Sequence, residues 1–360
     1  MPKIFLSEWP QPIEAGRLRI LEAALDAGVP FPHSCGSGEC GTCKCRLLEG
    51  EVKHDRHSPE ALSEEEYGQG LILACRSRPL TDVRVQWLSE SAPSAMVKHD
   101  AVVGRVEHAS RDVVLLTVPL GTGQPFPFRS GQFAKLRFGR LPVRSYSMAS
   151  QPGDGELVFH IRIRPDGRVS QHVAHELRAG DPVEVRGPFG EAYWEGKRPA
   201  RNGAGNEPNG AAAHDPPRHL LLLAGGTGMA PILSVLDAAL RDGHDPSAID
   251  VYHGVRTPAD LYAERLLEHR AREFGLRFVP VFAEGGPGRT GMLHDAVAQD
   301  FRDLAASLIH VAGPPPMVDA VRSIAHSRGA TSKRIRADAF HPSDPEKRSL
   351  WERVTAWGAL

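Results

Sequence analysis

Four cysteines have the spacing of an iron–sulfur site. Cys35, Cys40 and Cys43 stand in the order C-x4-C-x2-C, and Cys75 follows after a long interval. This spacing is typical of [2Fe–2S] centres, in which four thiolates hold two irons. The glycines between these cysteines would let the loop turn tightly, at positive φ where needed, with backbone N–H groups directed at cluster sulfurs. We therefore predict that Cys35, Cys40, Cys43 and Cys75 bind a [2Fe–2S] cluster.

Zinc and disulfides are the alternative uses of these cysteines. A structural zinc site usually has two close Cys or His pairs, whereas here three cysteines crowd one loop and one is distant. A disulfide framework fits poorly with five cysteines, an odd number, in a long chain that has no export signal. Cys45 is the cysteine left over, and we expect it to pack in a core on the strand that leaves the loop.

A second chemical signature is a nucleotide-binding turn. The apolar run Leu220–Ala224 is typical of a strand buried on both faces of a parallel sheet, and Gly225-Gly-Thr-Gly228 follows directly. A helix with Pro231 in its first turn comes next. Strand, glycine turn and helix start together predict a dinucleotide pyrophosphate site, although this is not the G-x-G-x-x-G fingerprint. Gly313-Pro-Pro-Pro-Met317 ends a later strand at the same sheet edge.

A third signature combines Arg144-Ser145-Tyr146-Ser147 with Gly167-Arg-Val-Ser170. The first motif alone is weak, because any edge strand carries such residues. The second stands at a predicted helix N-terminus, where free N–H groups and the helix dipole suit a phosphate. Arg144 could clamp the same phosphates, Tyr146 could stack on a planar ring, and Ser147 could hydrogen-bond a ring nitrogen. The two motifs together predict a ligand with phosphates and a planar ring.

Composition narrows the class of protein. The chain has 360 residues, enough for two or three domains, and its 44 acidic and 43 basic residues nearly balance. Bulk charge therefore gives no reason to expect nucleic acid or a membrane surface as a partner. No apolar run approaches the ~18–20 residues of a transmembrane helix, and the N-terminus lacks a signal-peptide pattern. We expect a cytoplasmic protein.

The elements that must position the cysteines form a small α+β unit over residues 1–88. Leu18, Leu21 and Leu25 have helical spacing, and Gly28 stands where a glycine would end that helix. A strand is expected at Lys44–Leu48, and the apolar run before Cys75 would anchor the last ligand on the core. Residues 89–100 are short, polar and rich in small residues, which indicates a linker.

Residues 101–195 change character. Short β-branched runs separated by Gly and Pro turns indicate a closed barrel or a sandwich. One helix, Ser170–Leu177, interrupts them. The expected strands are Val102–Val106, Val113–Val118, Gln132–Phe138, Arg144–Met148, Leu157–Ile163 and Pro182–Arg186. Residues 196–217 contain almost nothing that could pack, so we expect a disordered insert there.

Residues 218–342 alternate strands with helices, which predicts a parallel α/β sheet. After Leu220–Ala224 and its helix, the expected elements are a strand at Ile249–Val255, a helix at Asp260–Phe274, a strand at Phe278–Phe282, a helix around Leu293–Phe301 and a strand at Leu308–Ala312.

In this order the motifs resemble the ferredoxin–NADP⁺ reductase family joined to an N-terminal plant-type ferredoxin domain. The resemblance covers residues 1 to about 342. It is carried by the cysteine set with CGTC and LACRS, by RSYS at 144–147, GRVS at 167–170, GPFG at 187–190, GGTGMAP at 225–231 and GPPPM at 313–317. The domain order resembles that of aromatic-ring-hydroxylating dioxygenase reductases, such as those for naphthalene or benzoate, and soluble methane and phenol monooxygenase reductases share it.

The resemblance implies a multidomain chain of α+β, β and α/β units. They are a β-grasp-like ferredoxin domain (1–88), the linker (89–100), an antiparallel β-barrel that binds flavin (101–195), the insert (196–217), a parallel nucleotide-binding domain (218–342) and a C-terminal extension (343–360). The extension carries Trp351 and Trp357 and passes the usual end of the family. We expect it to dock on the protein's own surface, and a partner contact is the alternative.

The resemblance also implies residue roles. Arg144 would hold the flavin pyrophosphate, Tyr146 would stack on the isoalloxazine, and Ser147 would approach its N5. Ser147, Thr227 and Phe340 would form the hydride-transfer centre, Phe340 by way of an acidic-x-Phe ending at Asp338-Ala-Phe340. The full set implied for cofactor binding is Arg144, Ser145, Tyr146, Ser147, His160, Ile161, Arg162, Gly167, Val169, Ser170, Gly225, Gly226, Thr227, Gly228, Gly313, Pro314 and Met317. Many members have cysteine where this chain has Ala312, which concerns how the nicotinamide is held.

The implied activity is NAD(P)H-dependent electron transfer. Hydride from the nicotinamide would reduce FAD, favoured over FMN by the resemblance, and electrons would then pass singly through the [2Fe–2S] cluster. The acceptor would be a Rieske ferredoxin or a terminal oxygenase, and the reductase itself would be a monomer. A monooxygenase reductase of the same architecture and a redox-sensing module without turnover are the alternatives. Arg256, after the second strand of the nucleotide domain, leaves NADH or NADPH open.

Overall fold

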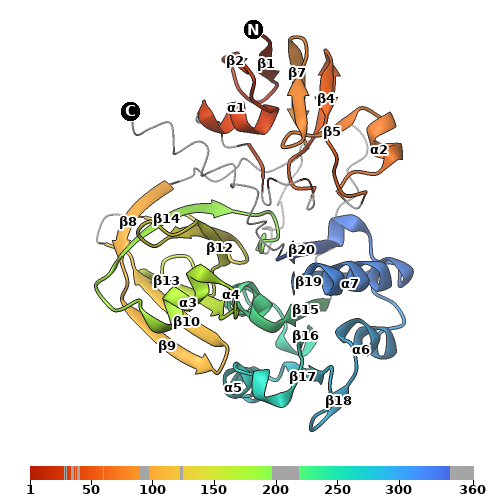
Figure 1. Cartoon of the computed structure of the whole chain (residues 1–360). Coiled ribbons are helices and arrows are strands. Elements are labelled where there is room, and N and C mark those ends of the chain that lie inside the picture. The colour runs from red at the N-terminus through yellow and green to blue at the C-terminus, as the bar shows by residue number, and fades with distance from the viewer. Residues whose placement is uncertain are drawn as a thin grey trace, which may run out of the picture.

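The computed structural model describes residues 1–27, 29, 31–33, 36, 38, 41–59, 61–88, 97–121, 125–196 and 219–340 (Figure 1). These residues form three units, each around apolar cores of its own. The N-terminal unit lies above the other two in the view of Figure 1, and the middle and C-terminal units lie side by side below it.

The N-terminal unit is a mixed sheet with two short helices. Its sheet has the order β2-β1-β7-β3-β5, in which β1 and β7 are parallel and the other neighbours are antiparallel. The elements are β1 Lys3–Leu6, β2 Ile13–Glu14, α1 Ile20–Asp26, β3 Lys44–Glu49, β4 Val52–His54, α2 Glu64–Gly68, β5 Leu71–Leu73, β6 Ser77–Pro79 and β7 Val83–Trp87.

The two elements predicted for this unit are present. The strand expected at Lys44–Leu48 is β3, one residue longer. The helix built on leucine spacing is α1, which begins at Ile20, after Leu18. Leu18 is 38% exposed, because it stands in the turn that leads into the helix rather than on its buried face. Gly28, expected to end this helix, lies outside the described residues.

The middle unit consists of two antiparallel sheets, ordered β13-β10-β9 and β12-β11-β14-β8, with one apolar core shared between them. Closure into a barrel stays a prediction. The elements are β8 Val97–Val102, β9 Arg105–Ser110, β10 Val113–Pro119, β11 Phe133–Arg137, β12 Arg144–Ser147, β13 Glu156–Arg162, α3 Arg168–His175 and β14 Pro182–Phe189.

One strand prediction in this unit was wrong. The run Val102–Val106 is not a single strand, because the chain passes there from one sheet to the other. β8 pairs with β14, and β9 pairs with β10. Gly104 is needed at this crossing, since a Cβ there would lie 2.8 Å from the Pro119 side chain. β8 also begins at Val97, so part of the segment expected as linker belongs to the sheet.

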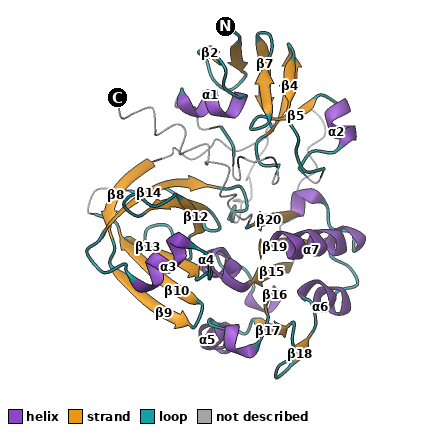
Figure 2. Ribbon diagram, in the orientation of Figure 1, coloured by secondary structure: helices purple, strands orange, loops and turns teal. Residues whose placement is uncertain are grey.

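The C-terminal unit is a six-stranded, fully parallel sheet ordered β18-β17-β16-β15-β19-β20 (Figure 2). Helices α4 and α5 contribute to the core on one face, and α6 and α7 to the core on the other. The elements are β15 His219–Gly225, α4 Met229–Arg241, β16 Ile249–Val255, α5 Glu264–Phe274, β17 Arg277–Phe282, β18 Arg289–Thr290, α6 Leu293–Asp300, β19 Ser307–Gly313, α7 Pro315–Ser327 and β20 Ile335–Ala339.

The strand order explains where a ligand would bind. From β15 the chain moves outward through β16, β17 and β18, and then crosses back to place β19 and β20 on the opposite side of β15. β15 and β19 therefore end at the topological switch point, where open α/β sheets bind ligands. The parallel sheet predicted from the alternation of strands and helices is confirmed. Helix α7 and strand β20 were not predicted.

Candidate redox-cofactor sites

Two of the four predicted cluster ligands lie together. Cys75 donates its backbone N–H to the Sγ of Cys43 at 3.5 Å, and both side chains are buried. Cys43 directly precedes β3, and Cys75 follows β5, which pairs with β3. The hairpin-like pairing of these strands thus brings distant cysteines side by side. Cys35 and Cys40 lie outside the described residues.

The glycines of the cysteine loop adopt the backbone predicted for them. Gly36, Gly38 and Gly41 have φ angles of 67°, 84° and 75°, a region that residues with a side chain rarely occupy. A Cβ at Gly38 would also lie 2.8 Å from the side chain of Arg76. The loop therefore requires glycine at Gly38 on two independent grounds, conformation and space.

Cys45 differs from the other described cysteines in its surroundings. It lies in the middle of the sheet, opposite Ile72 of β5 and Trp87 of β7, and its side chain is 0% exposed. Burial raises the pKa of the Cys45 thiol, which keeps it protonated and unreactive. Its predicted role in core packing is confirmed by this position.

The RSYS motif forms the whole of strand β12. Arg144 donates through Nη1 to the Val143 carbonyl at 2.8 Å, and the Tyr146 ring is half-buried. Burial raises the pKa of the Tyr146 hydroxyl. Met148, just after the strand, bridges to Phe159 of β13, so Ser147 and His160 lie on neighbouring strands. The edge strand β12 thus presents alternate side chains beside β13.

The GRVS motif begins helix α3, as predicted. Gly167 is the N-cap residue, and the helix starts at Arg168, two residues before the expected Ser170. Ser170 Oγ accepts the Arg164 N–H and donates to the Gly167 carbonyl, both at 3.0 Å. A Cβ at Gly167 would collide with this hydroxyl. The side chain of Val169 is buried, so the polar groups at the start of α3 are those of its backbone.

The two glycine motifs of the C-terminal unit pack against each other. A Cβ at Gly228 would overlap the Ala312 carbonyl, and one at Gly225 would lie 2.5 Å from Met317 Sδ. Gly313 has a φ of 148° and touches Gly225. Gly226 to Gly228 form a short 3₁₀ turn that leads into α4, with Thr227 half-buried. The turn expected after β15 and the proline motif after β19 therefore pack closely together at the switch point, and this pair of turns is called the glycine site below.

Three aromatic residues join the middle and C-terminal units beside this site. His160 Nδ1 and the Tyr262 hydroxyl form a 2.8 Å hydrogen bond, and the Tyr262 ring stacks edge-on against both His160 and His253. His253 donates through Nε2 to the Gly226 carbonyl at 3.0 Å. Burial lowers the pKa of His160 to about 3 and that of His253 to about 4, so both rings are neutral.

Sequence reasoning assigned His160 to cofactor binding and did not find Tyr262 or His253. One local signal was present, since His253 lies within the mostly buried strand β16. Ile161 is buried in the core of the middle unit, whereas Arg162 is exposed and pairs with Asp112 at 3.3 Å. The structure thus places these three neighbours in three different surroundings.

Strand β20 brings the C-terminal unit to the RSYS strand. Ser147 Oγ donates to Asp338 Oδ2 at 2.9 Å, a contact across 191 positions of the chain. Burial raises the pKa of Asp338 to about 6, while the hydrogen bond from Ser147 opposes the rise. Phe340 N–H donates to the Gly313 carbonyl at 2.8 Å, which ties the end of β20 to the glycine site. Ser147, Asp338 and Gly313 therefore belong to one connected region.

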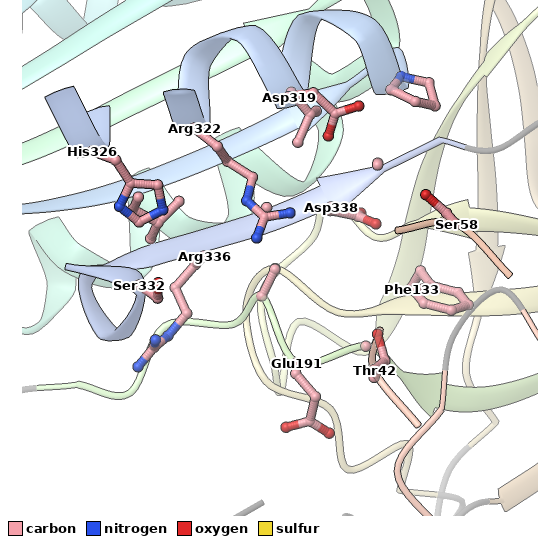
Figure 3. A pocket seen from close by; sticks show the side chains of 18 residues that line it. Thr42, Ser58, Phe133, Glu191, Asp319, Arg322, His326, Ser332, Arg336 and Asp338 are labelled. Atoms are coloured by element: carbon pink, nitrogen blue, oxygen red, sulfur yellow. The ribbon is translucent and has the colours of Figure 1, made fainter. Parts of the chain in front are cut away.

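A cavity of about 420 Å³ lies where the three units meet (Figure 3). Thr42 and Ser58 of the N-terminal unit face Asp338 of β20 across it, and Phe133 of β11 and Glu191 form part of its wall. Thr42 stands directly before Cys43 in the sequence. The cavity therefore reaches from the cysteine loop to the carboxyl group that binds Ser147.

Three family models match the chain in the order of its units. A 2Fe-2S iron-sulfur cluster binding domain matches residues 8–80, an oxidoreductase FAD-binding domain residues 100–194, and an oxidoreductase NAD-binding domain residues 222–323. The chain is 35% identical to the ferredoxin–NAD(P)⁺ reductase component of the naphthalene 1,2-dioxygenase system of Pseudomonas putida, over 92% of this chain and 95% of the relative. This chain belongs to the family of ferredoxin–NAD(P)⁺ reductase components.

Other members support the assignment. The reductase component of the naphthalene 1,2-dioxygenase/salicylate 5-hydroxylase systems of a Ralstonia species is 34% identical over 90% of this chain and 94% of its own. The crystal structure of a cytochrome P450 reductase from Amycolatopsis superposes with a TM-score of 0.76 at 32% identity, covering 96% of this chain and 100% of that one. The ferredoxin reductase of carbazole 1,9a-dioxygenase gives 0.67 at 27%, covering 94% and 98%.

Family membership makes the protein an oxidoreductase with domains for a [2Fe–2S] cluster, FAD and a nicotinamide nucleotide. Among the helices that the structure describes, none has the length and apolar character needed to cross a membrane.

Proposed function

We propose that this reductase transfers electrons from NAD(P)H, through FAD and a [2Fe–2S] cluster, to a Rieske ferredoxin or to the oxygenase component of an aromatic-ring-hydroxylating dioxygenase. The observation that carries the proposal is one cavity whose walls hold sequence neighbours or hydrogen-bond partners of the three signatures, among them Pro315 of the GPPPM motif. Its walls include Thr42, next to Cys43, and Asp338, which binds Ser147 of the RSYS strand. The glycine site at Gly225 and Gly313 adjoins the same strand end.

The residues present fit the three groups. The Cys43 thiol, which follows a loop of positive-φ glycines and accepts the backbone N–H of Cys75, suits a cluster. The N-terminal turn of α3 suits a pyrophosphate, and the glycine site has no room for side chains that would block a nucleotide. When bound, FAD exchanges a hydride for single electrons and the cluster carries those electrons onward.

The chain's own residues would orient the groups and manage a proton. Arg144 and the α3 N-terminus would hold the flavin phosphates, Tyr146 would cover the ring, and Thr227 with the glycines would hold the nicotinamide nucleotide. Ser147 Oγ hydrogen-bonds to Asp338, whose pKa of about 6 allows the carboxyl to gain or lose a proton near neutral pH. The pair could therefore hold a proton at Ser147 Oγ and exchange it with the cavity. Phe340, tied to Gly313, would lie against the flavin.

The cluster ligands would be Cys35, Cys40, Cys43 and Cys75. We propose that the remaining residues of the cofactor set named in the sequence analysis, beginning with His160 and ending with Met317, also contribute to cofactor binding. We also propose a β-grasp-like N-terminal domain, a closed flavin barrel that begins with β8 at Val97, and other domain limits near residues 88, 195, 218 and 342, each unit having a separate core. We propose further that the protein is a monomer and acts in the cytoplasm.

Two electron acceptors test the proposed route. Ferricyanide can take electrons from the reduced flavin, whereas cytochrome c would depend on the cluster as the one-electron outlet. We expect Cys75→Ser protein to keep NADH–ferricyanide activity and to lose most cytochrome c reduction together with the visible iron–sulfur spectrum. Cys45→Ser is the matched control and should keep both activities. Loss of both activities from Cys75→Ser protein that still holds its flavin would refute this route.

A reductase for a monooxygenase is the second candidate. It is favoured by the similarity to a cytochrome P450 reductase, which spans 96% of this chain. The internal route would be the same, and only the acceptor would differ. Pairing the purified reductase with a Rieske ferredoxin or with a P450, under NADH, would separate the two by rate.

A further inference from the structure

One aromatic contact joins the cluster-bearing unit to the flavin unit. The ring of His33, two residues before Cys35, lies edge-on against the ring of Phe189, with ring centroids 5.1 Å apart and planes at 69°. Phe189 is the last residue of β14 and stands within the GPFG motif. Edge-to-face packing at this separation is a favourable geometry for two rings. Neither residue belongs to the predicted cofactor set.

The His33 ring is fixed on the side of the cluster unit. Its Nδ1–H donates to the Phe31 carbonyl at 2.8 Å. Phe31 is 1% exposed and packs edge-on against Trp87 of β7, with ring centroids 5.5 Å apart. The orientation of the His33 ring is therefore set by the core of its own unit rather than by solvent.

The Phe189 ring is fixed on the flavin side. It packs against Phe133 at 5.6 Å between ring centroids, and the Lys135 ammonium lies 4.4 Å from its centre. Gly190 has a φ of 96°, and a Cβ there would lie 3.0 Å from the Phe133 ring. Phe133 pairs in register with Ser147 of the RSYS strand. A packed path therefore runs from His33 to the strand that would hold the flavin.

This contact lies at one side of the junction between the units, and His33 stands two residues before the predicted ligand Cys35 in the sequence. On the other side of the junction, the cavity separates Thr42 and Ser58 from β20. Units within a chain can move relative to each other. A contact whose two rings are each fixed in their own unit, close in sequence to a predicted cluster ligand, is well placed to set the docked position.

We propose that His33 is a positioning residue, which docks the cluster-bearing unit on Phe189 and thereby sets the rate of electron transfer from flavin to cluster. This inference rests on the proposed function. Electron transfer falls steeply with distance, so loss of the contact slows that step. It leaves the earlier hydride step unchanged, because the hydride step involves only the flavin and nucleotide units.

Full-length holoenzyme with His33→Ala or His33→Phe tests the proposal. Rapid mixing with NADH would follow flavin absorbance and cluster absorbance separately. An aromatic pair contributes about 0.5–1.5 kcal/mol, which corresponds to a change of about two- to tenfold in a docking equilibrium. We expect His33→Ala to slow cluster reduction by that factor at an unchanged rate of flavin reduction. His33→Phe keeps a ring and should restore the wild-type rate.

A second measurement reports docking without turnover. Amide hydrogen exchange in the segment from Gly187 to Tyr193 should be faster in His33→Ala than in the wild type, and the radius of gyration from X-ray scattering should be larger. His33→Phe should match the wild type in both. A His33→Ala protein with full iron and flavin that shows wild-type cluster reduction and wild-type exchange would overturn the proposal.

Phe189→Leu covers the case in which His33→Ala loses its iron. This variant removes the ring from the flavin side and leaves the cysteine loop unaltered. The same slowing and the same faster exchange are expected, and their absence in a protein with full iron and flavin would overturn the proposal. Failure of the wild type to reduce ferricyanide with NADH would instead refute the proposed function, while the exchange comparison would still decide the docking contact.

Discussion

The two edges of the six-stranded sheet use polar groups in opposite ways. At the amino edge, where the strands begin, charged side chains bind one another: Asp250 accepts from His219 at 2.7 Å, and Asp300 accepts from Arg277 at 2.7 Å. At the carboxyl ends of β15 and β19 the side chains are missing, and Gly225, Gly228 and Gly313 let the two turns pack closely. Paired side chains thus mark the amino edge of this unit, and close-packed glycines mark the carboxyl ends of its two central strands.

The ionic network at the amino edge centres on Asp300. Its carboxylate accepts from Arg277 and Arg289, and it also accepts from the Tyr252 hydroxyl. Although partial burial opposes ionisation, hydrogen bonds from Arg289, Tyr252 and Arg277 lower the pKa of Asp300 to about 2. Each of these four side chains therefore has a partner within the network.

The largest expected effect is on stability at the amino edge. Asp300→Asn leaves two arginines without their carboxylate and should lower the free energy of unfolding by about 3 kcal/mol, because hydrogen bonds to a charged group contribute about 1.5–3 kcal/mol. Urea unfolding monitored by far-UV circular dichroism measures this loss. NADH–ferricyanide activity per folded molecule should stay at the wild-type level, and its loss would show that this edge takes part in catalysis.

The wild-type contribution of Asp300 also has a defined pH dependence. Because the folded pKa is about 2 and the unfolded value about 3.9, the stabilisation is present above pH 4 and is lost as the pH falls toward 2. The difference between wild type and Asp300→Asn should shrink in that window.

The next effect concerns the carboxyl edge. Gly228→Ala places a Cβ onto the Ala312 carbonyl, so the turn after β15 must shift. A displacement of about 1 Å in a reacting site can cost about a hundredfold in rate. We expect kcat/KM for NADH to fall about a hundredfold while flavin and iron contents are retained. Gly68→Ala is the matched control, since that glycine ends α2 without a positive φ and a Cβ there meets no atom within 4 Å. Equal activities for the two variants would remove the distinction between the edges.

The sequence could predict those elements that depend on a local pattern of residues. The strand Ile249–Val255 and the start of α4 after the glycine turn were predicted from local patterns, and both are confirmed. Apolar periodicity and glycine placement are local, so one stretch of chain suffices to recognise them. Helix α7 was not predicted because its first turn begins with consecutive prolines. Strand β20 was not predicted because small and charged residues alternate in Ile335–Ala339.

Contacts between distant segments could not be predicted. Nothing near Ser147 in the sequence indicates Asp338, and nothing near His33 indicates Phe189. Each pair depends on how separate units pack, which a single sequence does not record. The run Val102–Val106 failed for a related reason, because β-branched residues favour a strand but do not say which sheet the strand joins.

A smaller effect contrasts Asp338 with Asp300. Burial raises the pKa of Asp338 to about 6, above the unfolded value of about 3.9. Folding therefore takes up a proton between pH 4 and 6, and wild-type stability falls as the pH rises through that window. Asp338→Asn removes this loss and should stabilise the flavin-free protein by about 1–2 kcal/mol at pH 7.5, with little change at pH 4. Unfolding at the two pH values measures the difference, and a destabilisation at pH 7.5 would contradict the assigned shift.

The smallest expected effect concerns the choice of nucleotide. Arg256 follows β16 at the carboxyl edge, and its Nε lies 3.8 Å from Glu284 and 3.9 Å from Asp260. In dinucleotide folds an acidic residue near this strand end binds the ribose 2′-hydroxyl of NADH, whereas an arginine accommodates the 2′-phosphate of NADPH. Here two carboxylates surround the arginine. A 2′-phosphate would meet like charge, so we expect the wild type to prefer NADH.

Glu284→Lys should reverse the local charge without altering a buried contact, because this side chain is 61% exposed. Like charges placed together cost enough to change a binding preference, so the ratio of kcat/KM for NADPH to that for NADH should rise about tenfold. Ferricyanide reduction with each nucleotide measures the ratio. Glu268→Lys on α5 adds the same charge beside Arg272, away from Arg256, and serves as the control for bulk charge. A similar rise in the control would assign the effect to net charge. No rise in either variant would mean that the carboxylates around Arg256 do not contact the ribose end of the nucleotide.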